Sequence, residues 1–481
     1  MKIIFVLLAL LTFPGTCVCA QTPLRLEDLQ QRASRTALNV LTARQQLEAA
    51  SLETDAFQAS LKPQLDLVAN LPNYFRTSRE VTLDDGTIGF REIELNNSFV
   101  GLFASQRVAA TGATISLESR LQRTDNLALD GKSYQGSPVR LFLRQPLLAF
   151  NPLKWDKEIL SLRRAVRQRE LAAAAADAAL EATDRFFDLV AADQERRIAQ
   201  LNKTANEQLY RVAEERYELG KINRGDLVQL RLELASAEQN LIRADRLVAA
   251  ASANIQRLLG EGFSGQTFVP TLPDTVDLST VDAARAREQM TARRPEILAA
   301  RLRQREAARQ TDQTKKDLGP RIDIEAGIGL VRSDAELAPI YNDPRGERIV
   351  SVNLAVPVLD WGQRRARTRR AASAEELARE LARRTELDLG TELTQLLAQW
   401  RTVQEELRLA TEIRDLAEER FTISRESYEL GAIPLTQLTL AQQFRDRNLR
   451  AYADTLRAYW QTYARLARLT LWDFINERPL G

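Results

Sequence analysis

The sequence contains one long unit twice, and this duplication limits the possible folds more than any other feature. The tetrapeptide Tyr-Glu-Leu-Gly occurs at residues 217–220 and again at 428–431, which is an offset of 211 positions (428 − 217). The same offset relates Pro146 to Pro357 and continues without a gap to at least Leu258. Such internal similarity predicts two structurally equivalent repeats.

Each repeat contains a very long predicted helix. No proline interrupts Leu153–Leu219 or Gln363–Leu430. About 67 residues with a rise of ~1.5 Å each form a rod of roughly 100 Å, which far exceeds the usual length of a globular helix. In each repeat a glycine ends the rod at a tip, and a second helix returns. Neighbouring helices must cover the apolar side of such rods.

Apolar residues recur every three or four positions along these helices, which is typical of coiled-coil seams. The one charged member of the second rod, Arg414, has Ile413 beside it to fill the gap. Charged residues occupy most of the remaining positions. The predicted seam consists of Leu393, Leu396, Trp400, Val403, Leu407, Ala410, Arg414, Ala417, Phe421, Ser424 and Tyr428 on the rod, of Leu449, Tyr452, Leu456, Tyr459, Tyr463 and Leu466 on its return helix, and of Leu241, Ala244, Val248, Ala251, Ile255 and Leu258 in the first repeat.

The composition excludes several classes of protein. The chain has no histidine, which rules out Ser-His-Asp and Cys-His catalysis as well as histidine-ligated metals. Its only cysteines are Cys17 and Cys19. A net charge of +2 over 481 residues argues against a nucleic-acid partner. We therefore expect no enzymatic activity, no cofactor and no metal site.

The first 20 residues are typical of a secretory signal peptide. Lys2 precedes an apolar core at 3–11, and Val-Cys-Ala at 18–20 resembles a cleavage site. We predict cleavage after Ala20 and export. Lipid attachment at Cys17 or Cys19 is the less favoured alternative, because the residues before each fit a lipobox poorly. The apolar core is too short to span a bilayer, and no later run of 18 apolar residues exists.

Alternating apolar residues predict strands in both repeats. In the second repeat they occupy about 321–358, where Ile322–Leu330 and Val350–Val358 alternate with polar or small residues. In the first repeat the strands occupy about 64–148. The prolines at 63 and 320 are offset by 257, so this part holds 46 additional residues (257 − 211).

The additional residues predict one extra hairpin around Thr111-Gly112, between 97–109 and 113–122, giving six strands instead of four. Polar segments at 76–94, 124–137 and 332–348 are predicted to be loops. Whether the extra hairpin lies in the wall of a barrel stays open at this stage.

The apolar side of these strands could cover a soluble core or face lipid. The chain is predicted to be exported, and the sequence near the strands offers no globular helical layer to cover them. This context favours lipid.

The layout is thus a signal peptide at 1–20, a first repeat at 21–258, a linker at 259–282 and a second repeat at 283–481. Each repeat begins with a helix, at 21–61 in the first copy and after Arg-Pro-Glu at 294–296 in the second. The linker is predicted from its glycines and prolines to run along the helical body. The fold class is mainly α with a β-barrel part.

With its signal peptide, two strand-helix-tip-helix units, Tyr-Glu-Leu-Gly tips and Arg-Pro-Glu-Ile at 294–297, the chain resembles the TolC family of outer-membrane efflux channels. The resemblance covers essentially the whole mature chain. It implies a homotrimer in which the chains share one β-barrel in outer-membrane lipid and one α-helical barrel that extends into the periplasm. It also implies partners, namely a periplasmic adaptor and an inner-membrane transporter of RND, ABC or similar type.

Such a channel conducts small molecules or polypeptides passively from the pump to the cell exterior, in tripartite efflux or type I secretion. The sequence names neither the cargo nor the pump. The principal alternative is a periplasmic coiled-coil structural or adaptor protein with a small β domain. An enzyme is the least favoured class, because no carboxylate pair or nucleophile has a recognisable setting.

The resemblance also implies a periplasmic aperture at the tips. Family members commonly carry acidic residues just after the tip glycine. The sixth residue after Gly220 is Asp226, which matches, whereas the sixth after Gly431 is Gln437. This departure argues against a strong acidic ring and against a sharp preference for cations.

Each tip residue also has an ordinary structural explanation. Gly220 and Gly431 fit the position just past a helix end, and Asp226 fits the first turn of the returning helix. For Tyr217 and Tyr428, a seam position is favoured over contact with an adaptor.

Overall fold

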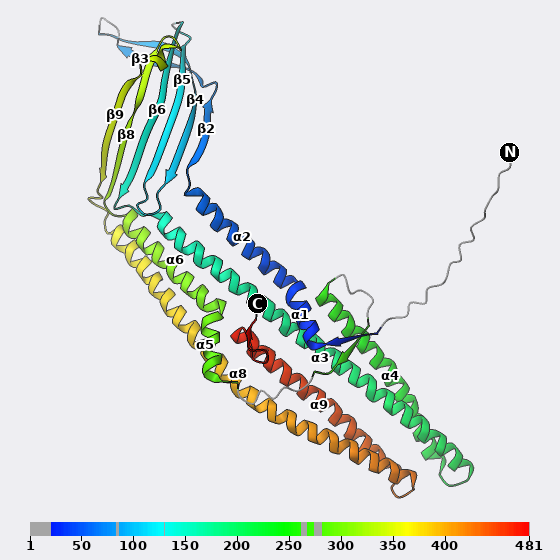
Figure 1. The fold of residues 1–481 in the computed structure, drawn as a ribbon. Helices are drawn as coiled ribbons and strands as arrows, with labels where there is room; N and C mark the ends of the chain where they lie inside the picture. Colours follow the sequence, from blue (N-terminus) through cyan, green and yellow to red (C-terminus); the bar gives the residue numbers. More distant parts are fainter. Residues whose placement is uncertain (1–20, 83–85, 129, 261–266, 274–280, 481) are drawn as a thin grey trace, which may run out of the picture. The chain divides into compact units, whose positions relative to one another are not determined.

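The computed structural model describes residues 21–82, 86–128, 130–260, 267–273 and 281–480, so the predicted signal peptide and Cys17 and Cys19 lie outside the described residues. The chain forms two compact units. The helical unit comprises residues up to Arg44, Arg169–Arg294, and those from Asp388 onward; the sheet unit comprises Gln45–Gln168 and Pro295–Leu387. Figure 1 labels most of their elements.

Two long helices and two returning helices dominate the chain. The long helices α3 (Pro152–Glu218) and α8 (Gln363–Glu429) are 67 residues each, and the returning helices α4 (Arg224–Leu259) and α9 (Leu435–Thr470) are 36 residues each. The predicted rods are therefore present, and α8 runs through Gly390 without interruption. Among the described residues, no helix combines the length and the apolar character needed to cross a bilayer.

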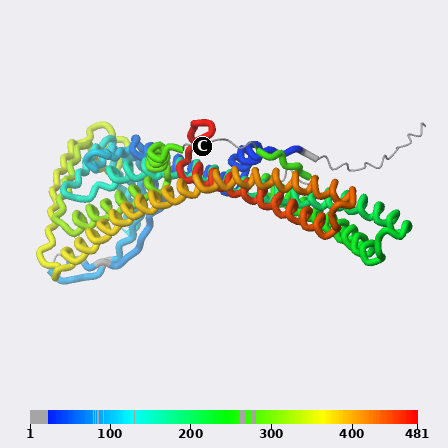
Figure 2. The backbone as a smooth tube through the Cα atoms, turned by 90° about the horizontal axis from the view of Figure 1, so that it is seen from below, coloured from blue at the N-terminus to red at the C-terminus, as the bar shows by residue number. Residues whose placement is uncertain are grey.

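The residues of the predicted seam are buried or partly buried in the helical unit. The Trp400 side chain of α8 is 2% exposed, and its ring lies 4.8 Å from that of Tyr459 and 6.0 Å from that of Tyr463 on α9. The two helices run side by side there (Figure 2). Arg414 stays on the seam by stacking on Tyr452, with 4.4 Å between guanidinium and ring centroid. The expectation that Ile413 fills this place is wrong, because its side chain is exposed.

The start of the chain differs from the predicted helix at 21–61. It begins with strand β1 (Gln21–Arg25), followed by α1 (Leu26–Thr36) and α2 (Leu38–Ser60). β1 pairs in parallel with β7 (Thr267–Thr271), which lies within the segment predicted as a linker. Leu24 and Phe268 of this pair are buried, so tertiary packing outweighs the helical pattern here.

Shorter elements complete the two units. In the helical unit, α5 (Ala283–Arg293) packs near the end of α9, and β10 (Trp472–Asp473) pairs with β11 (Arg478–Pro479). In the sheet unit, α6 (Pro295–Asp317) leads into the sheet, and α7 (Pro339–Asn342) is a single turn between two strands.

The sheet unit contains one antiparallel sheet of seven strands. Six strands are hydrogen-bonded one to the next, and β3 (Tyr74–Thr82) pairs with the first part of β4, at residues 88–96. The predicted hairpin around Thr111-Gly112 is present as β4 and β5. The order is β2 (Gln64–Asn70), β4 (Ile88–Arg107), β5 (Thr114–Asn126), β6 (Gly131–Leu147), β8 (Arg321–Asp334) and β9 (Arg345–Ala355).

Two of the three predicted loops, 76–94 and 124–137, are largely strands, whereas most of 332–348 lies outside the strands. The first of them adds β3, which is why the sheet has seven strands and not six. Segment 76–94 forms the hairpin of β3 and β4, and segments 124–137 and 332–348 contain the ends of β5, β6, β8 and β9. Strand pairing uses backbone hydrogen bonds and needs no apolar side. Cross-strand pairs such as Arg76 with Glu92 then stabilise polar extensions of the sheet. β9 ends before Pro357, which has no N–H to donate.

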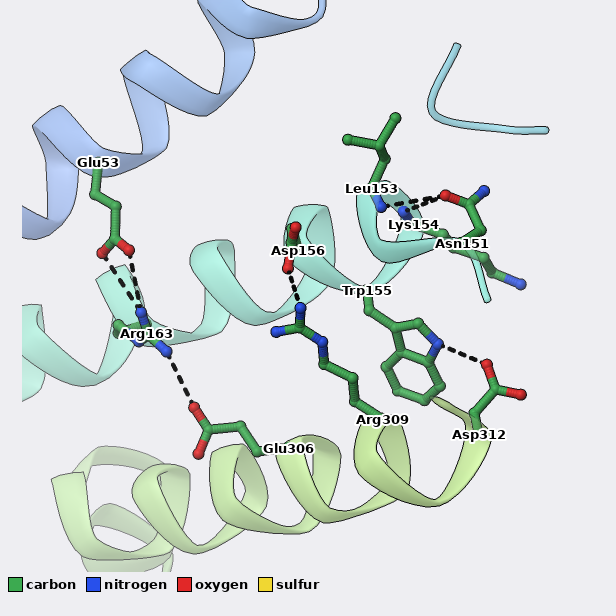
Figure 3. A network of polar contacts seen from close by, with 10 residues as sticks. All are labelled: Glu53, Asn151, Leu153, Lys154, Trp155, Asp156, Arg163, Glu306, Arg309 and Asp312. Carbon is green, nitrogen blue, oxygen red and sulfur yellow. Dashed lines mark hydrogen bonds and ion pairs between the residues drawn. The ribbon is translucent and has the colours of Figure 1, made fainter. Parts of the chain in front are cut away.

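Ion pairs and hydrogen bonds connect three helices of the sheet unit (Figure 3). Arg163 of α3 pairs with Glu53 of α2 at 3.2 Å and with Glu306 of α6 at 3.1 Å. The Nε1–H of Trp155 donates to Asp312 of α6 at 2.9 Å. These contacts fix α3, which begins just after β6, against the helices that precede β2 and β8.

One face of the sheet is covered by apolar side chains. The register aligns them in rows, since Leu117 of β5 lies opposite Ala104 of β4 and Leu141 of β6, and Leu141 lies opposite Ile328 of β8. Most of these side chains are exposed or partly exposed. This apolar face consists of Leu65, Leu67, Ala69, Val100, Leu102, Ala104, Ile115, Leu117, Leu121, Val139, Leu141, Leu143, Ile322, Ile324, Ala326, Ile328, Leu330, Val350, Val352 and Leu354.

The opposite, polar face carries charges that neutralise one another across strands. Arg140 of β6 lies 2.9 Å from Glu347 of β9 and 3.9 Å from Glu118 of β5. Its side chain crosses β8 at Gly329, where a Cβ atom would lie 2.6 Å from Arg140 Cγ and 2.9 Å from the carbonyl oxygen of Val139. The glycine therefore makes room for the arginine and its ion pairs.

We expect Gly329→Ala to destabilise the sheet, because the added methyl group must displace backbone as well as the arginine. Overpacking of this kind costs about 1–3 kcal/mol. Gly346→Ala is the matched control, since a Cβ atom there meets nothing within 4 Å. Thermal loss of the strand signal in circular dichroism of the detergent-purified protein measures the effect. Equal midpoints for both variants would contradict this explanation of the glycine.

Candidate functional site at the helical tips

Both tips of the helical unit end their long helix with the same hydrogen bonds. At the first tip Gly220 has φ of +69°, its N–H donates to the Tyr217 carbonyl at 2.9 Å, and the Lys221 N–H donates to the Arg216 carbonyl at 2.8 Å. This pair of bonds is a Schellman motif, which needs a residue with positive φ and so favours glycine.

The second tip repeats this arrangement around Gly431, whose φ is +78°. The Gly431 N–H donates to the Tyr428 carbonyl at 2.9 Å, and the Ala432 N–H donates to the Ser427 carbonyl at 2.8 Å. The structural role predicted for both glycines, just past a helix end, is confirmed.

The returning helices begin differently at the two tips. At the first, the Asn223 side chain accepts a hydrogen bond from the Asp226 N–H at 2.9 Å, so Asp226 lies in the first turn of α4. At the second, Pro434 is the N-cap and makes no side-chain cap, and the Gln437 N–H donates to its carbonyl at 3.0 Å. The Asp226 and Gln437 side chains are both exposed.

The two tips contact each other through Arg216. Its Nη2 donates to the Glu429 carbonyl at 3.4 Å, and its guanidinium lies 6.0 Å from the centroid of the Tyr428 ring. Partial burial raises the pKa of Tyr428 above its ordinary value; Arg216 acts to lower the pKa, and Asp226 acts to raise it. Tyr428 and Asp226 are therefore electrostatic neighbours, although they belong to different hairpins.

The two predicted tyrosines have different surroundings. Tyr428 packs against Phe421, Leu438 and Ala441, as a seam residue does. Tyr217 remains 41% exposed within the chain. The structure thus brings Tyr428 to the junction of the tips and leaves Tyr217 on an outer surface.

A cavity of about 500 Å³ lies between the two hairpins beside the tips. Its apolar part includes Leu209, Phe421 and Leu438, while Arg211 and Arg425 are among its basic residues. A more polar cavity of about 610 Å³ lies farther along α3, α4 and α9 and is lined by residues such as Asn202, Asn206 and Asp446. The helical unit therefore contains two sizeable cavities near its tips.

A buried polar network beside these cavities was missed by the sequence analysis. Arg445 and Asp446 of α9 are 5% and 7% exposed. Arg445 Nη2 lies 2.6 Å from Asp446 Oδ1 and donates to the Asn202 Oδ1 of α3 at 2.7 Å, while the Asn202 amide donates back to Asp446 at 2.6 Å. The Arg445 guanidinium also stacks 4.0 Å from the Phe421 ring centroid.

A signal for this network exists in the sequence. Arg445 stands on the apolar stripe that runs through Leu438, Ala441 and Leu449, so it is a charged residue at a seam position. The same holds for Arg414 on α8, and in both cases an aromatic ring on the partner helix receives the guanidinium. In both cases, an arginine on the apolar stripe of one helix indicates an aromatic residue opposite it on the partner helix.

We expect Arg445→Met to weaken the packing of α9 strongly, because it leaves the Asp446 carboxylate buried without its cation. Breaking a buried pair in this way costs about 3–5 kcal/mol. Arg450→Met is the control on the same helix, since the Arg450–Glu195 pair is largely exposed and is worth about 0–1 kcal/mol. Amide hydrogen exchange of residues 441–449 measures the local opening free energy. Similar exchange rates in the two variants would show that the network adds no stability.

Comparison with known proteins agrees with this architecture. The model of the outer membrane efflux protein family matches residues 104–261 and 286–470. No curated protein matches the chain.

Among solved structures, the chain is similar to the CmeC outer membrane channel of Campylobacter jejuni, at 13% identity and a TM-score of 0.65, over 92% of this chain and 85% of that one. The MtrE outer membrane channel of Neisseria gonorrhoeae in its open state gives 15% identity and a TM-score of 0.62, over 93% and 88%. A membrane protein from Pseudomonas aeruginosa gives 18% identity and a TM-score of 0.67, over 92% of this chain and 90% of that one. At such low identity, these likenesses concern the fold.

The family match covers well over half of the sequence, on both sides of the segment between the repeats. The protein therefore belongs to the outer membrane efflux protein family, and its fold is that of the TolC-like outer-membrane channels.

Proposed function

We propose that three copies of this chain form a passive channel across the outer membrane, which receives small molecules or polypeptides from a periplasmic adaptor and an inner-membrane pump. The system is tripartite efflux or type I secretion. The observation that carries the proposal is the sheet, which has one continuous apolar face, one charged face and, within the described residues, two open edges. Family membership supports the efflux role.

The apolar face suits the hydrocarbon of a bilayer. On β8 it extends from Ile322 to Leu330, which is about the 9–11 residues that a tilted transmembrane strand needs. A water-filled lumen suits the polar face, where Arg140 and Arg144 pair with glutamates of neighbouring strands. The alternation of apolar-out and polar-in residues is the pattern of outer-membrane barrels.

The two edges of the sheet support assembly from several chains. Within the described residues, the outer edges of β2 and β9 pair with no other strand. An unpaired edge in lipid leaves backbone N–H and C=O groups without hydrogen bonds, so the barrel must close. In our proposal the β9 edge of one chain pairs with the β2 edge of the next, and three chains complete the wall.

The segment between β9 and α8 fits the periplasmic boundary of the membrane. Val358 and Trp361 are 93% and 89% exposed there, and Trp361 has a positive φ of +52° in the turn. Five exposed arginines follow in the first turns of α8, at 364, 365, 367, 369 and 370. Tryptophan is enriched at membrane interfaces, and arginines just beyond it suit lipid phosphates.

The remaining parts of the proposal concern export and the periplasm. Residues 1–20 direct export, and each of the two repeats supplies strands to the barrel and one hairpin to a periplasmic α-helical barrel. The tips form the aperture, where Tyr217, Gly220, Asp226, Tyr428, Gly431 and Gln437 lie. The contact between the tips through Arg216 supports an aperture whose two hairpins move together.

The proposal is tested by single-channel recording of the detergent-purified protein in a planar bilayer with a salt gradient. We expect discrete conductance steps with a weak preference for cations, because each chain places one acid and one amide at the aperture. Asp226→Asn should lower the cation preference, and Gln437→Glu should raise it. Glu477→Gln, on an exposed side chain of the C-terminal tail, is the control and should change neither.

Two results would count against the proposal. A protein that stays soluble and never inserts into the bilayer would favour a periplasmic structural or adaptor protein. If the protein inserts but its ion selectivity is the same in the variants at residues 226 and 437, the aperture lies elsewhere.

A further inference from the structure

We infer that the β4–β5 hairpin forms part of the membrane-spanning wall, so that each chain contributes six wall strands and three chains close a barrel of eighteen (6 × 3). This inference rests on the proposed function. It concerns the extra residues of the first repeat, whose place the sequence left open. The part of the apolar face on which the inference depends consists of Val100, Leu102, Ile115 and Leu117.

The order of strands gives the first argument. β4 and β5 lie between β2 and β6, and they pair with each other from Leu95 opposite Asn126 to Arg107 opposite Thr114. β2 joins the sheet through β4. A wall without the hairpin would therefore have to break the pairing on both sides and bring β2 against β6.

The apolar side chains give the second argument. Ile115 of β5 stands in one row with Leu143 of β6, Ala326 of β8 and Val350 of β9. The four apolar residues of the hairpin are 36–48% exposed, while Val139, Leu141 and Leu143 of β6 are 39–44% exposed. The hairpin thus presents apolar surface on the same face, in the same rows and to the same degree as β6. In the proposed channel, hydrocarbon is the surrounding that suits an uncovered face of this extent.

The polar face gives the third argument. Glu118 of β5 is one of the two carboxylates near Arg140, and Arg120 of β5 stacks 4.2 Å from the ring centroid of Phe99 on β4. The charges of the hairpin therefore belong to the same network as those of β6 and β9. A hairpin folded away from the wall would separate them.

The turn of the hairpin is also anchored at the rim where the helices begin. The Asn151 amide donates to the Ala109 carbonyl at 2.9 Å, and its Oδ1 accepts from the Leu153 N–H at 3.1 Å at the start of α3. The Gln145 amide of β6 donates to the Thr111 carbonyl at 3.1 Å. Residues 108–113 are thus held at the end of β6, level with the other strands.

The consequence is a wide exit. Strands spaced about 4.7 Å apart and tilted by about 40° give a backbone diameter of roughly 35 Å for eighteen strands, against roughly 23 Å for twelve. Barrels of 16–18 strands leave an aqueous channel. The barrel would therefore not limit the size of the cargo, and the tips of the helical unit would.

Site-directed spin labelling tests the inference. Cys17 and Cys19 are the only cysteines, so single cysteines in a background with serine at both positions are unique. Labels at Leu102→Cys and Leu117→Cys probe the hairpin, labels at Leu141→Cys and Val352→Cys probe strands that any barrel of this chain would contain, and Ser116→Cys probes the polar face next to Leu117. The protein is reconstituted into vesicles of phosphatidylethanolamine and phosphatidylglycerol, and relaxation by oxygen is compared with relaxation by a water-soluble nickel chelate.

We expect the labels at 102 and 117 to be accessible to oxygen and protected from nickel, as at 141 and 352, and the label at 116 to be accessible to nickel. If the labels at 102 and 117 are accessible to nickel while those at 141 and 352 are protected, the inference is wrong and the proposed channel function still holds. Nickel accessibility at all four positions would overturn the channel as well.

A second measurement guards against local misfolding of a labelled strand. Ala104 and Leu141 stand two strands apart in one row, with Leu117 between them, which places them about 10 Å apart. Labels at both positions should show dipolar broadening in the membrane. Its absence would mean that β4 leaves the wall.

Discussion

Burial of the aromatic seam between α8 and α9 is the interaction on which the helical unit depends. A helix of 67 residues gains little from its own hydrogen bonds in water and needs a partner along its apolar side. Trp400 supplies the largest contact, because its ring meets both Tyr459 and Tyr463. Burying such aromatic groups contributes several kcal/mol. The charged residues on the seam do not interrupt it, because Arg414 and Arg445 stack on aromatic rings and keep the helices in register.

The sheet unit depends on the same separation of apolar and polar surface, with a period of two instead of three to four. Charges on its polar face pair within the chain, as Arg140 does with Glu347. Its apolar face stays uncovered in the chain, and its edges stay open within the described residues. In the proposed trimer, lipid covers the apolar face and neighbouring chains pair with the edges. The sheet unit is thus complete only in the environment in which we propose it works.

The elements with strong periodicity could be predicted from the sequence. The rods, their return helices and the seam follow from repeated spacing, and the structure places the rods within a few residues of the expected bounds. The β4–β5 hairpin follows from the additional residues around Thr111-Gly112, although β4 begins nine residues earlier than expected. The predictions failed where the decisive contacts are not periodic. β3 and the outer ends of β5, β6, β8 and β9 are polar on both sides, so backbone pairing forms them without a hydrophobic signal. β1 and β7 pair across more than two hundred residues, and Leu24 and Phe268 alone are too short a pattern to show it.

The candidate site was predictable in its backbone and less so in its side chains. Glycine at 220 and 431 follows from the need for positive φ at a helix end, and both positions have it. The sequence could not show that Arg216 joins the two tips or that Tyr428 and Tyr217 have different surroundings, because those contacts join residues far apart in the chain.

The unequal caps of the returning helices have a consequence for the aperture. Asn223 fixes the first turn of α4 and holds the backbone of Asp226, so this acid has a defined place near a helix N-terminus, where its negative charge is partly balanced by the helix dipole. Pro434 fixes the other tip through its rigid φ and leaves Gln437 without charge. In the proposed aperture each chain would then offer one partly balanced carboxylate, which favours a pathway that excludes solutes by size more than by charge.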